Sequence, residues 1–142
     1  MKITQIFAFQ HKVKHQLPLY VEGVSAGFPS AADDYIETKL DLNEHLIKHP
    51  AATFFVRVEG SSMIKAGIQS GDILIVDRAL EAGDNQIVIA LINGEFTVKR
   101  ISHDKNKVYL TPANPAFQPI EVTSEMDFEV WGVVTYVIHQ AK

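Results

Sequence analysis

The stretch QIVIALINGEFTVKRI, residues 86–101, decides the fold class. Two runs rich in β-branched and aromatic residues lie on either side of Asn93 and Gly94. These two residues tolerate the positive φ angles of a two-residue type I′ turn, and the β-rich runs beside them are typical of strands. The stretch therefore predicts a β-hairpin.

Runs on both sides of this hairpin carry further strand patterns. They are TFFVRV at 53–58, DILIVD at 72–77 and KVYLTP at 107–112. Residues 130–138 are apolar on both faces, as expected of a strand buried in a core or at a subunit contact. The prolines of PANPAFQPI, residues 112–120, favour irregular or edge structure. Together these patterns predict a mainly β fold.

The remaining segments predict one short helix and an N-terminal arm. In residues 41–49, Asp41 or Asn43 offers an N-cap, and the following Pro50 stops a helix. Residues 1–30 show no sustained periodicity and end in a stretch rich in Gly, Ala, Ser and Pro. We therefore predict an arm over 1–30 and one β domain over 31–142, a length that suits a single core.

Composition excludes several classes of function. The chain is 46% hydrophobic and 21% charged, as in ordinary globular proteins. Its net charge of −4 disfavours direct nucleic-acid binding. No apolar run approaches the roughly 18 residues that cross a bilayer, and the start does not resemble a secretory signal, so a cytoplasmic protein is expected. The absence of cysteine excludes disulfides, thiolate catalysis and zinc–sulfur sites.

The stretch FFVRVEGSSMIKAG, residues 54–67, ends a strand pattern in a glycine and two serines. One of these serines can cap a short helical turn, or one hydroxyl can be a nucleophile. Lys99 is equally open to two interpretations, because alternation groups it with Thr97 and opposite Val98 without showing which face is buried. Residue patterns alone leave these alternatives open.

Three segments taken together resemble the LexA and UmuD family of self-cleaving proteins. They are Gly60-Ser61-Ser62-Met63, Thr97-Val98-Lys99 and Ala26-Gly27. The likeness extends from about residue 18 to the C-terminus and includes SGDILIVD and PANPAFQPI. It implies that the β domain has the LexA-like peptidase fold.

In that family the serine of a Gly-x-Ser-Met segment is the nucleophile and the lysine of a Thr-Val-Lys segment is its base. The resemblance therefore implies a serine endopeptidase with Ser62 as nucleophile and Lys99 as base. It also implies that the chain cuts its own bond between Ala26 and Gly27, where the small residues let the backbone lie deep against the site.

Two further roles are expected around this bond. Val24, just before the bond, is expected to anchor the segment in an apolar pocket. The negative charge that develops on the carbonyl oxygen of the cut bond needs donors, for which the backbone amides of Ser61 and Ser62 are the natural candidates.

The proposed base sets a physical requirement. A lysine with an ordinary pKa near 10.4 is neutral in only about one molecule in 2,500 at pH 7, so the pKa of Lys99 must fall by roughly three units, or about 4 kcal/mol. Burial among apolar side chains supplies such a shift, because desolvation disfavours the ammonium. The sequence therefore predicts a desolvated pocket for Lys99 and cleavage that accelerates as the pH rises.

The resemblance also implies partners. Only about 26 residues precede the proposed cut, too few for a helix-turn-helix domain, so the likeness is to the UmuD-type mutagenesis branch rather than to the repressors. That branch implies a homodimer, stimulation of cleavage by a RecA–single-stranded DNA filament, and a trimmed form that serves a translesion (UmuC-type) polymerase in the SOS response to DNA damage. The segment with Trp131 and Tyr136 is either a dimer contact or plain core.

Alternative functions stay open. A non-catalytic dimeric module that regulates the polymerase as the full-length protein is one, and a repressor's peptidase domain without its DNA-binding half is another. Metal chemistry has little support, because His45 and His49 lack the His-Glu-x-x-His order. No metal and no cofactor is predicted.

Overall fold

The computed structural model describes residues 1–9, 16–20 and 36–142, and of residues 16–20 and 36–40 it describes the backbone. The chain forms two compact units. The larger unit contains Met1–Phe9 and Ala51–Lys142, and the smaller one contains Gln10–Pro50. The predicted cleavage segment with Val24, Ala26 and Gly27 lies outside the described residues.

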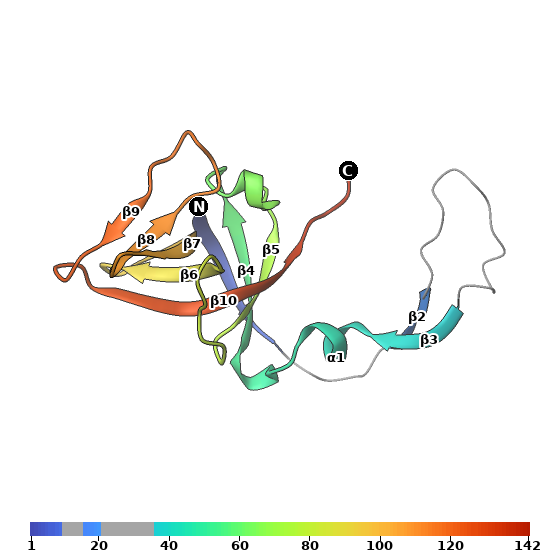
Figure 1. The fold of residues 1–142 in the computed structure, drawn as a ribbon. Helices are drawn as coiled ribbons and strands as arrows, with labels where there is room; N and C mark the ends of the chain where they lie inside the picture. The colour runs from blue at the N-terminus through green and yellow to red at the C-terminus, as the bar shows by residue number, and fades with distance from the viewer. Residues whose placement is uncertain (10–15, 21–35) are drawn as a thin grey trace. The chain divides into compact units, whose positions relative to one another are not determined.

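The larger unit is built on an eight-stranded antiparallel sheet with the order β1-β4-β5-β10-β6-β7-β8-β9 (Figure 1). The strands are β1 Lys2–Ala8, β4 Thr53–Glu59, β5 Ile73–Asp77, β6 Ile87–Ile92, β7 Glu95–Asp104, β8 Lys107–Thr111, β9 Ile120–Val122 and β10 Phe128–Ile138. Two short 3₁₀ turns, η2 Pro50–Ala52 and η3 Ile64–Ala66, flank β4. The mainly β, LexA-like fold class predicted from the sequence is confirmed.

The predicted hairpin is β6 and β7. Asn93 and Gly94 have φ angles of 48° and 83°, as a type I′ turn requires. Register pairs Ile92 with Glu95 and Val88 with Lys99. The hairpin thus fixes where Lys99 lies along the sheet.

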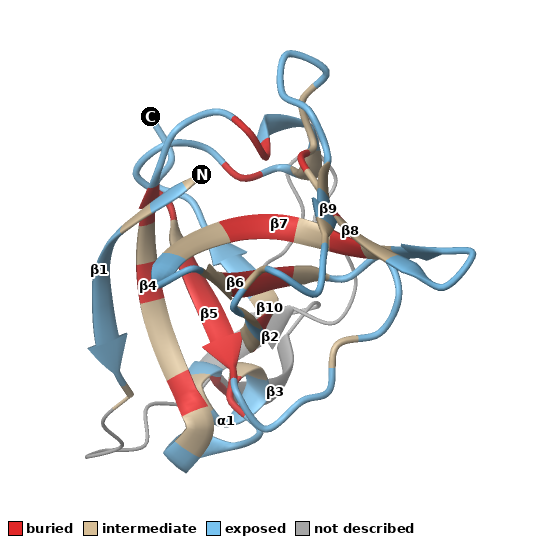
Figure 2. Cartoon of the chain, turned by 90° about the vertical axis from the view of Figure 1, so that its left-hand side faces the viewer, coloured by how far each residue is buried: buried red, intermediate tan, exposed pale blue. Residues whose placement is uncertain are grey.

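Buried side chains lie on both faces of the curled sheet, in two clusters. Figure 2 shows buried residues concentrated in β5 and in the middle of β7, with further buried positions along β4. Eight buried side chains form the main cluster, namely Val56, Val58, Met63, Ile68, Leu74, Val76, Ile89 and Val98. The sheet curls strongly from its edge strand β1 toward β7. The N–H of Val98 on β7 donates to the carbonyl of Met1, the residue just before β1, at 3.3 Å. This curl brings the end of β4 close to β7.

Strand β1 forms where the sequence pattern predicts no regular element. It pairs with β4 from Lys2, opposite Glu59, to Ala8, opposite Phe54. Its side chains are mostly exposed, with Ile3 partly buried. An edge strand of this kind is held by backbone hydrogen bonds, so it needs no hydrophobic alternation that a sequence pattern would reveal. The division into an arm over 1–30 and a domain over 31–142 stays a prediction.

The other strand expectations hold. TFFVRV, DILIVD and KVYLTP lie in β4, β5 and β8, and residues 112–119 form no strand before the short edge strand β9. In β10, Val133 is buried, whereas the end from Tyr136 to Ile138 is exposed. Trp131 packs its ring on Phe54 and on Phe96, at 5.2 and 5.5 Å between ring centroids.

The smaller unit pairs β2 Gln16–Tyr20 with β3 Ile36–Asp41, and a one-turn helix α1 Leu42–Leu46 follows. The side chain of Asp41 accepts hydrogen bonds from the N–H groups of Asn43 and Glu44, so Asp41 is the N-cap. The helix ends at Leu46, three residues before the predicted stop at His49.

Candidate active site

Ser62 lies in the turn that follows β4. Gly60 has a φ angle of +109°, which reverses the chain at the end of the strand and suits a residue without a Cβ atom. Ser62 is 2% exposed, whereas Ser61 is exposed. The 3₁₀ turn η3 has no side-chain cap, so a capping role for either serine is not seen.

Lys99 lies on β7, 37 residues further along the chain, and is 7% exposed. Its Nζ donates to Ser62 Oγ at 3.1 Å and to the carbonyl of Val98 at 3.2 Å. Val98 and Met63, the residues next to this pair in sequence, belong to the apolar core. The structure therefore brings Ser62 and Lys99 together in a buried setting, and it leaves Ser61 at the surface.

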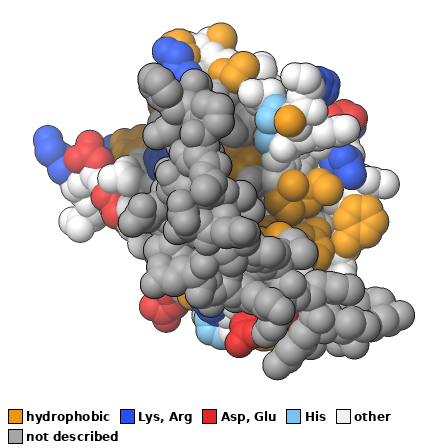
Figure 3. All heavy atoms as spheres, turned by 90° about the vertical axis from the view of Figure 1, so that its right-hand side faces the viewer, with side chains coloured by type: hydrophobic (Ala, Val, Ile, Leu, Met, Phe, Trp, Pro, Cys, Tyr) orange, Lys and Arg blue, Asp and Glu red, His pale blue; other side chains and the backbone are white. Residues whose placement is uncertain are grey.

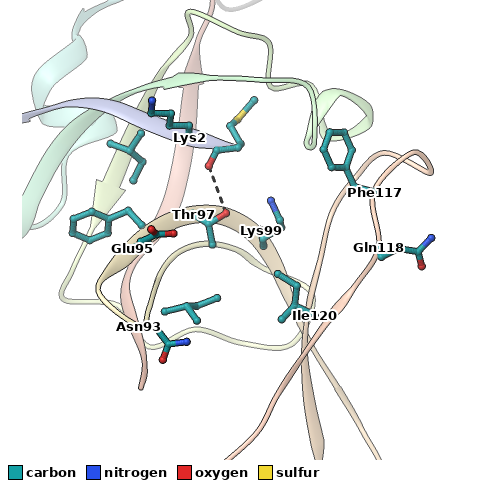
Figure 4. Close-up of a pocket in the computed structure, with 12 residues that line it drawn as sticks. Lys2, Asn93, Glu95, Thr97, Lys99, Phe117, Gln118 and Ile120 are labelled. Atoms are coloured by element: carbon teal, nitrogen blue, oxygen red, sulfur yellow. Dashed lines mark hydrogen bonds between the residues drawn. The ribbon is translucent and has the colours of Figure 1, made fainter. Parts of the chain in front are cut away.

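A third group at this site comes from the start of the chain. The α-amine of Met1 donates to Ser62 Oγ at 2.7 Å. The carbonyl of Met1 accepts from the Val98 N–H at 3.3 Å and from Thr97 Oγ1 at 3.5 Å (Figure 4). Burial, with the hydrogen bond and charge of Lys99, lowers the pKa of this amine from 8.0 to about 5. The Met1 amine is therefore neutral at pH 7 where it lies against Ser62.

No motif in the sequence indicates this contact. It follows from the pairing of β1 with β4, which directs the start of β1 toward β7, and that pairing has no alternation signal. Two amines, on Met1 and Lys99, thus flank one hydroxyl.

The loop between β8 and β9 holds the serine turn from another side. Asn114 Nδ2 donates to the carbonyl of Ser61 at 2.8 Å. The carbonyl of Ala113 accepts from the Lys65 N–H at 2.8 Å, and the Ala113 N–H donates to Met63 Sδ at 3.4 Å. The sequence places Asn114 in the proline-rich stretch without giving it a role.

The backbone donors of the turn differ in their partners. The Gly60 N–H donates to Ser70 Oγ at 3.2 Å. Within the described ranges, no hydrogen bond is formed by the N–H of Ser61 or of Ser62. The prediction that these two amides bind the oxyanion is therefore compatible with the contacts of the described residues.

An open pocket of about 840 Å³ adjoins Lys99. Figure 4 shows Lys99 pointing from β7 toward the space between β1 and Phe117. The pocket mixes apolar and polar side chains and is lined by Met1, Lys2, Ile3, Ile92, Asn93, Glu95, Phe96, Thr97, Lys99, Phe117, Gln118 and Ile120. A pocket of this size and lining accommodates a short peptide segment.

In residues 1–9, 16–20 and 36–142, no group of three or more His, Cys, Asp or Glu side chains is placed to hold a metal ion. The helices described in these ranges include none that is long and apolar enough to span a membrane.

Comparison with known proteins identifies the class. The sequence profile of the Peptidase S24-like family matches residues 18–135, and the chain belongs to that family. Similar proteins include protein SamA of Salmonella typhimurium, 47% identical over 133 residues that cover 94% of this chain and 92% of SamA. Protein MucA of Escherichia coli is 44% identical over 123 residues, covering 86% of this chain and 84% of MucA.

A repressor is also among the relatives. LexA repressor 2 of Pseudomonas syringae pv. tomato is 43% identical over 110 residues, which cover 78% of this chain and 54% of the repressor. Together with SamA and MucA it confirms the resemblance to the LexA/UmuD family and supports a protease of the serine type from the SOS mutagenesis group.

Proposed function

We propose that this protein is a self-processing serine peptidase that cuts its own Ala26–Gly27 bond, with Ser62 as nucleophile and Lys99 as general base. The observation that carries the proposal is the 3.1 Å hydrogen bond from Lys99 Nζ to Ser62 Oγ in a buried setting. A nucleophile and a base within hydrogen-bond reach are what covalent catalysis by a hydroxyl requires. Membership of the Peptidase S24-like family supports the same reaction.

The reaction has two halves. Ser62 Oγ attacks the carbonyl carbon of Ala26 as its proton passes to the neutral amine of Lys99. The N–H groups of Ser61 and Ser62 donate to the resulting oxyanion. The tetrahedral intermediate then expels the amine of Gly27, which takes the proton from Lys99, and water hydrolyses the remaining ester on Ser62.

The mechanism requires an uncharged Lys99 at the moment of attack. Lys99 Nζ donates to the Ser62 hydroxyl and to the Val98 carbonyl. Neither is a carboxylate that would hold the lysine as an ammonium ion. Val24 is assigned the anchoring role beside the bond, in an apolar part of the pocket.

Processing serves a larger assembly in this proposal. The trimmed chain acts in the cytoplasm as a homodimer and as an accessory subunit of an error-prone translesion (UmuC-type) polymerase, and a RecA–single-stranded DNA filament stimulates the cut. The likeness to SamA and MucA supports this branch of the family. The exposed apolar end of β10, with Tyr136, Val137 and Ile138, supports a contact between two copies. Hydrophobic side chains also gather on part of the face shown in Figure 3.

Fragment masses test the proposed cut. The purified protein is incubated between pH 7 and pH 9, and separately with an activated RecA filament, and the products are weighed by mass spectrometry. We expect fragments that end at Ala26 and begin at Gly27, at a rate that rises with pH because Lys99 acts as the neutral amine. Ser62→Ala should stay intact while Ser61→Ala is cut. A rate that falls from pH 7 to pH 9 with the fold intact contradicts the role of Lys99.

One observation favours a second function. The amine of Met1 donates to Ser62 Oγ at 2.7 Å, so another part of the chain already contacts the proposed nucleophile. This contact suits a non-catalytic dimeric binding module that regulates the polymerase as the full-length protein. In that case Ser62→Ala leaves both the chain length and the regulation of the polymerase unchanged, whereas under the peptidase proposal it abolishes processing.

A further inference from the structure

The peptide unit between Ser61 and Ser62 is held through its carbonyl oxygen. This oxygen accepts from Asn114 Nδ2 at 2.8 Å and from the Ile64 N–H at 3.2 Å. A peptide unit is planar, and in the trans form its C=O and N–H point to opposite sides. Any bond that directs the Ser61 carbonyl therefore also directs the Ser62 N–H, which lies in the same plane.

Asn114 is itself held in one orientation. Its Oδ1 accepts from the Ala116 N–H at 2.9 Å, while its Nδ2 faces the Ser61 carbonyl. If the amide were flipped, its Oδ1 would face the carbonyl oxygen of Ser61 and its Nδ2 would face the N–H of Ala116. Neither pair can form a hydrogen bond. The backbone of Ala113 adds two contacts to the serine turn, through Lys65 and Met63, so the loop and the turn are fixed to each other.

We propose that Asn114 is a positioning residue for cleavage: by holding the Ser61 carbonyl it aims the Ser62 N–H at the oxyanion of the reacting bond. This inference rests on the proposed peptidase function. Asn114 acts through the Ser61–Ser62 peptide unit and touches neither the substrate nor Lys99. Its loss should lower the rate of the chemical step and leave the base unchanged.

The size of the effect follows from the donor that Asn114 directs. Removal of one oxyanion donor costs about 10²- to 10³-fold in rate. Asn114→Ala leaves the Ser62 N–H in place and leaves the Ile64 contact to the Ser61 carbonyl, so part of the alignment survives. We expect a loss on the order of tenfold for Asn114→Ala, smaller than that of a missing donor.

Three proteins are compared with the wild type in full-length form. Asn114→Ala removes the amide, and Asn114→Asp keeps an acceptor for Ala116 but sets a carboxylate against the Ser61 carbonyl. Asn106→Asp is the matched control, because Asn106 lies in the exposed β7–β8 turn away from the serine. Self-cleavage is followed from pH 7 to pH 10, and thermal unfolding shows that each variant is folded.

Two readouts do not depend on the arm being cut. One is the rate at which a fluorophosphonate labels Ser62, in which Oγ bonds to phosphorus, fluoride leaves and the hydroxyl proton passes to Lys99. The other is the ¹H–¹⁵N signal of the Ser62 amide. We expect both Asn114 variants to label and cleave more slowly, Asn114→Asp most of all, with a shifted Ser62 signal and an unchanged pH of half-maximal rate. Asn106→Asp should match the wild type.

The inference is overturned if Asn114→Ala cleaves and labels within twofold of the wild type, or if it moves the pH profile without lowering the maximal rate. If the wild type is cut neither at alkaline pH nor with the filament, the proposed function fails. The labelling rate and the Ser62 amide signal then still show whether Asn114 orients the Ser61–Ser62 peptide unit. An unchanged Ser62 signal in Asn114→Ala overturns the inference about Asn114.

Discussion

Lys99 reaches Ser62 from the middle of β7, in a buried position. Replacing it with alanine removes the proposed base. We expect Lys99→Ala to slow self-cleavage by at least about 10²-fold, the lower end of what general-base catalysis contributes. Gel analysis of timed samples measures this rate.

Lys65→Ala is the control for this change, because Lys65 is exposed in the neighbouring 3₁₀ turn. It should cleave as the wild type does. Thermal unfolding of Lys99→Ala should show an intact fold, since a buried polar group is replaced by an apolar one. Cleavage of Lys99→Ala at the wild-type rate would remove the lysine from the mechanism.

The Met1 amine gives the resting site its own dependence on pH. Its pKa is 8.0 when free and about 5 when docked, so between pH 8 and pH 5 the undocked amine binds a proton that the docked one excludes. Docking is therefore at full strength above pH 8, weakens as the pH falls through this window, and stays weak below pH 5. Hydrogen-exchange protection of the Val98 N–H, which donates to the Met1 carbonyl, should fall from pH 8 to pH 5.

The N–H of Ile101, which donates to the Gln86 carbonyl, provides the reference for this measurement because it lies on the same strand away from Met1. Its protection should vary less over the same range. Protection of Val98 that is equal at pH 5 and pH 8 would contradict the docking of a neutral amine.

At the scale of elements, the sheet depends on a close approach between β10 and β5. A Cβ atom added to Gly132 would lie 2.5 Å from Val76 Cγ1. Val76 is fully buried and β-branched, so it has little freedom to move aside. We expect Gly132→Ala to lower the free energy of unfolding by about 1–3 kcal/mol, measured by urea titration.

Gly83→Ala is the matched control, because its added Cβ would make an ordinary contact of 3.6 Å with the Gln86 side chain. That variant should stay within about 0.5 kcal/mol of the wild type. Equal stability of the two variants would show that β10 shifts away from β5 without cost.

Sequence patterns predict the central strands well and the edges poorly. In β4, β5 and the β6–β7 hairpin the signals are strong, because runs of β-branched and aromatic residues supply buried side chains and Asn93–Gly94 marks the turn. The sequence pattern does not predict β1, because this edge strand is held by backbone pairing with β4. Alternation along β7 also does not predict whether the Lys99 side chain is buried, since this burial depends on the curl of the whole sheet. The roles of Ser62 and Lys99 follow from the family resemblance, whereas Asn114 and the Met1 amine need the structure.

At the scale of the whole molecule, the exposed apolar end of β10 is the contact that we propose for a second copy. Tyr136 is 42% exposed, and Val137 and Ile138 next to it are exposed as well. We expect Tyr136→Asp to weaken dimerisation by at least about tenfold, because a charge at the centre of an apolar contact is costly. Sedimentation over a range of concentrations measures the dissociation constant.

Leu80→Asp is the control for this change, since Leu80 is an exposed apolar residue in the loop after β5. It should dimerise as the wild type does. If the wild-type chain sediments as a monomer at all concentrations, there is no dimer contact. If Tyr136→Asp dimerises normally, the contact lies elsewhere.

The position of β10 in the sheet has a consequence for biosynthesis. Ser62 and Lys99 leave the ribosome before β10, which lies between β5 and β6 and so links the β4–β5 pair, whose connecting segment holds Ser62, to the β6–β7 hairpin that carries Lys99. A nascent chain that has not yet released residues 128–138 cannot close the sheet, although both reactive side chains are already present. Under the proposed self-cleavage, we therefore expect the Ala26–Gly27 bond to stay uncut during translation until the last strand has been inserted.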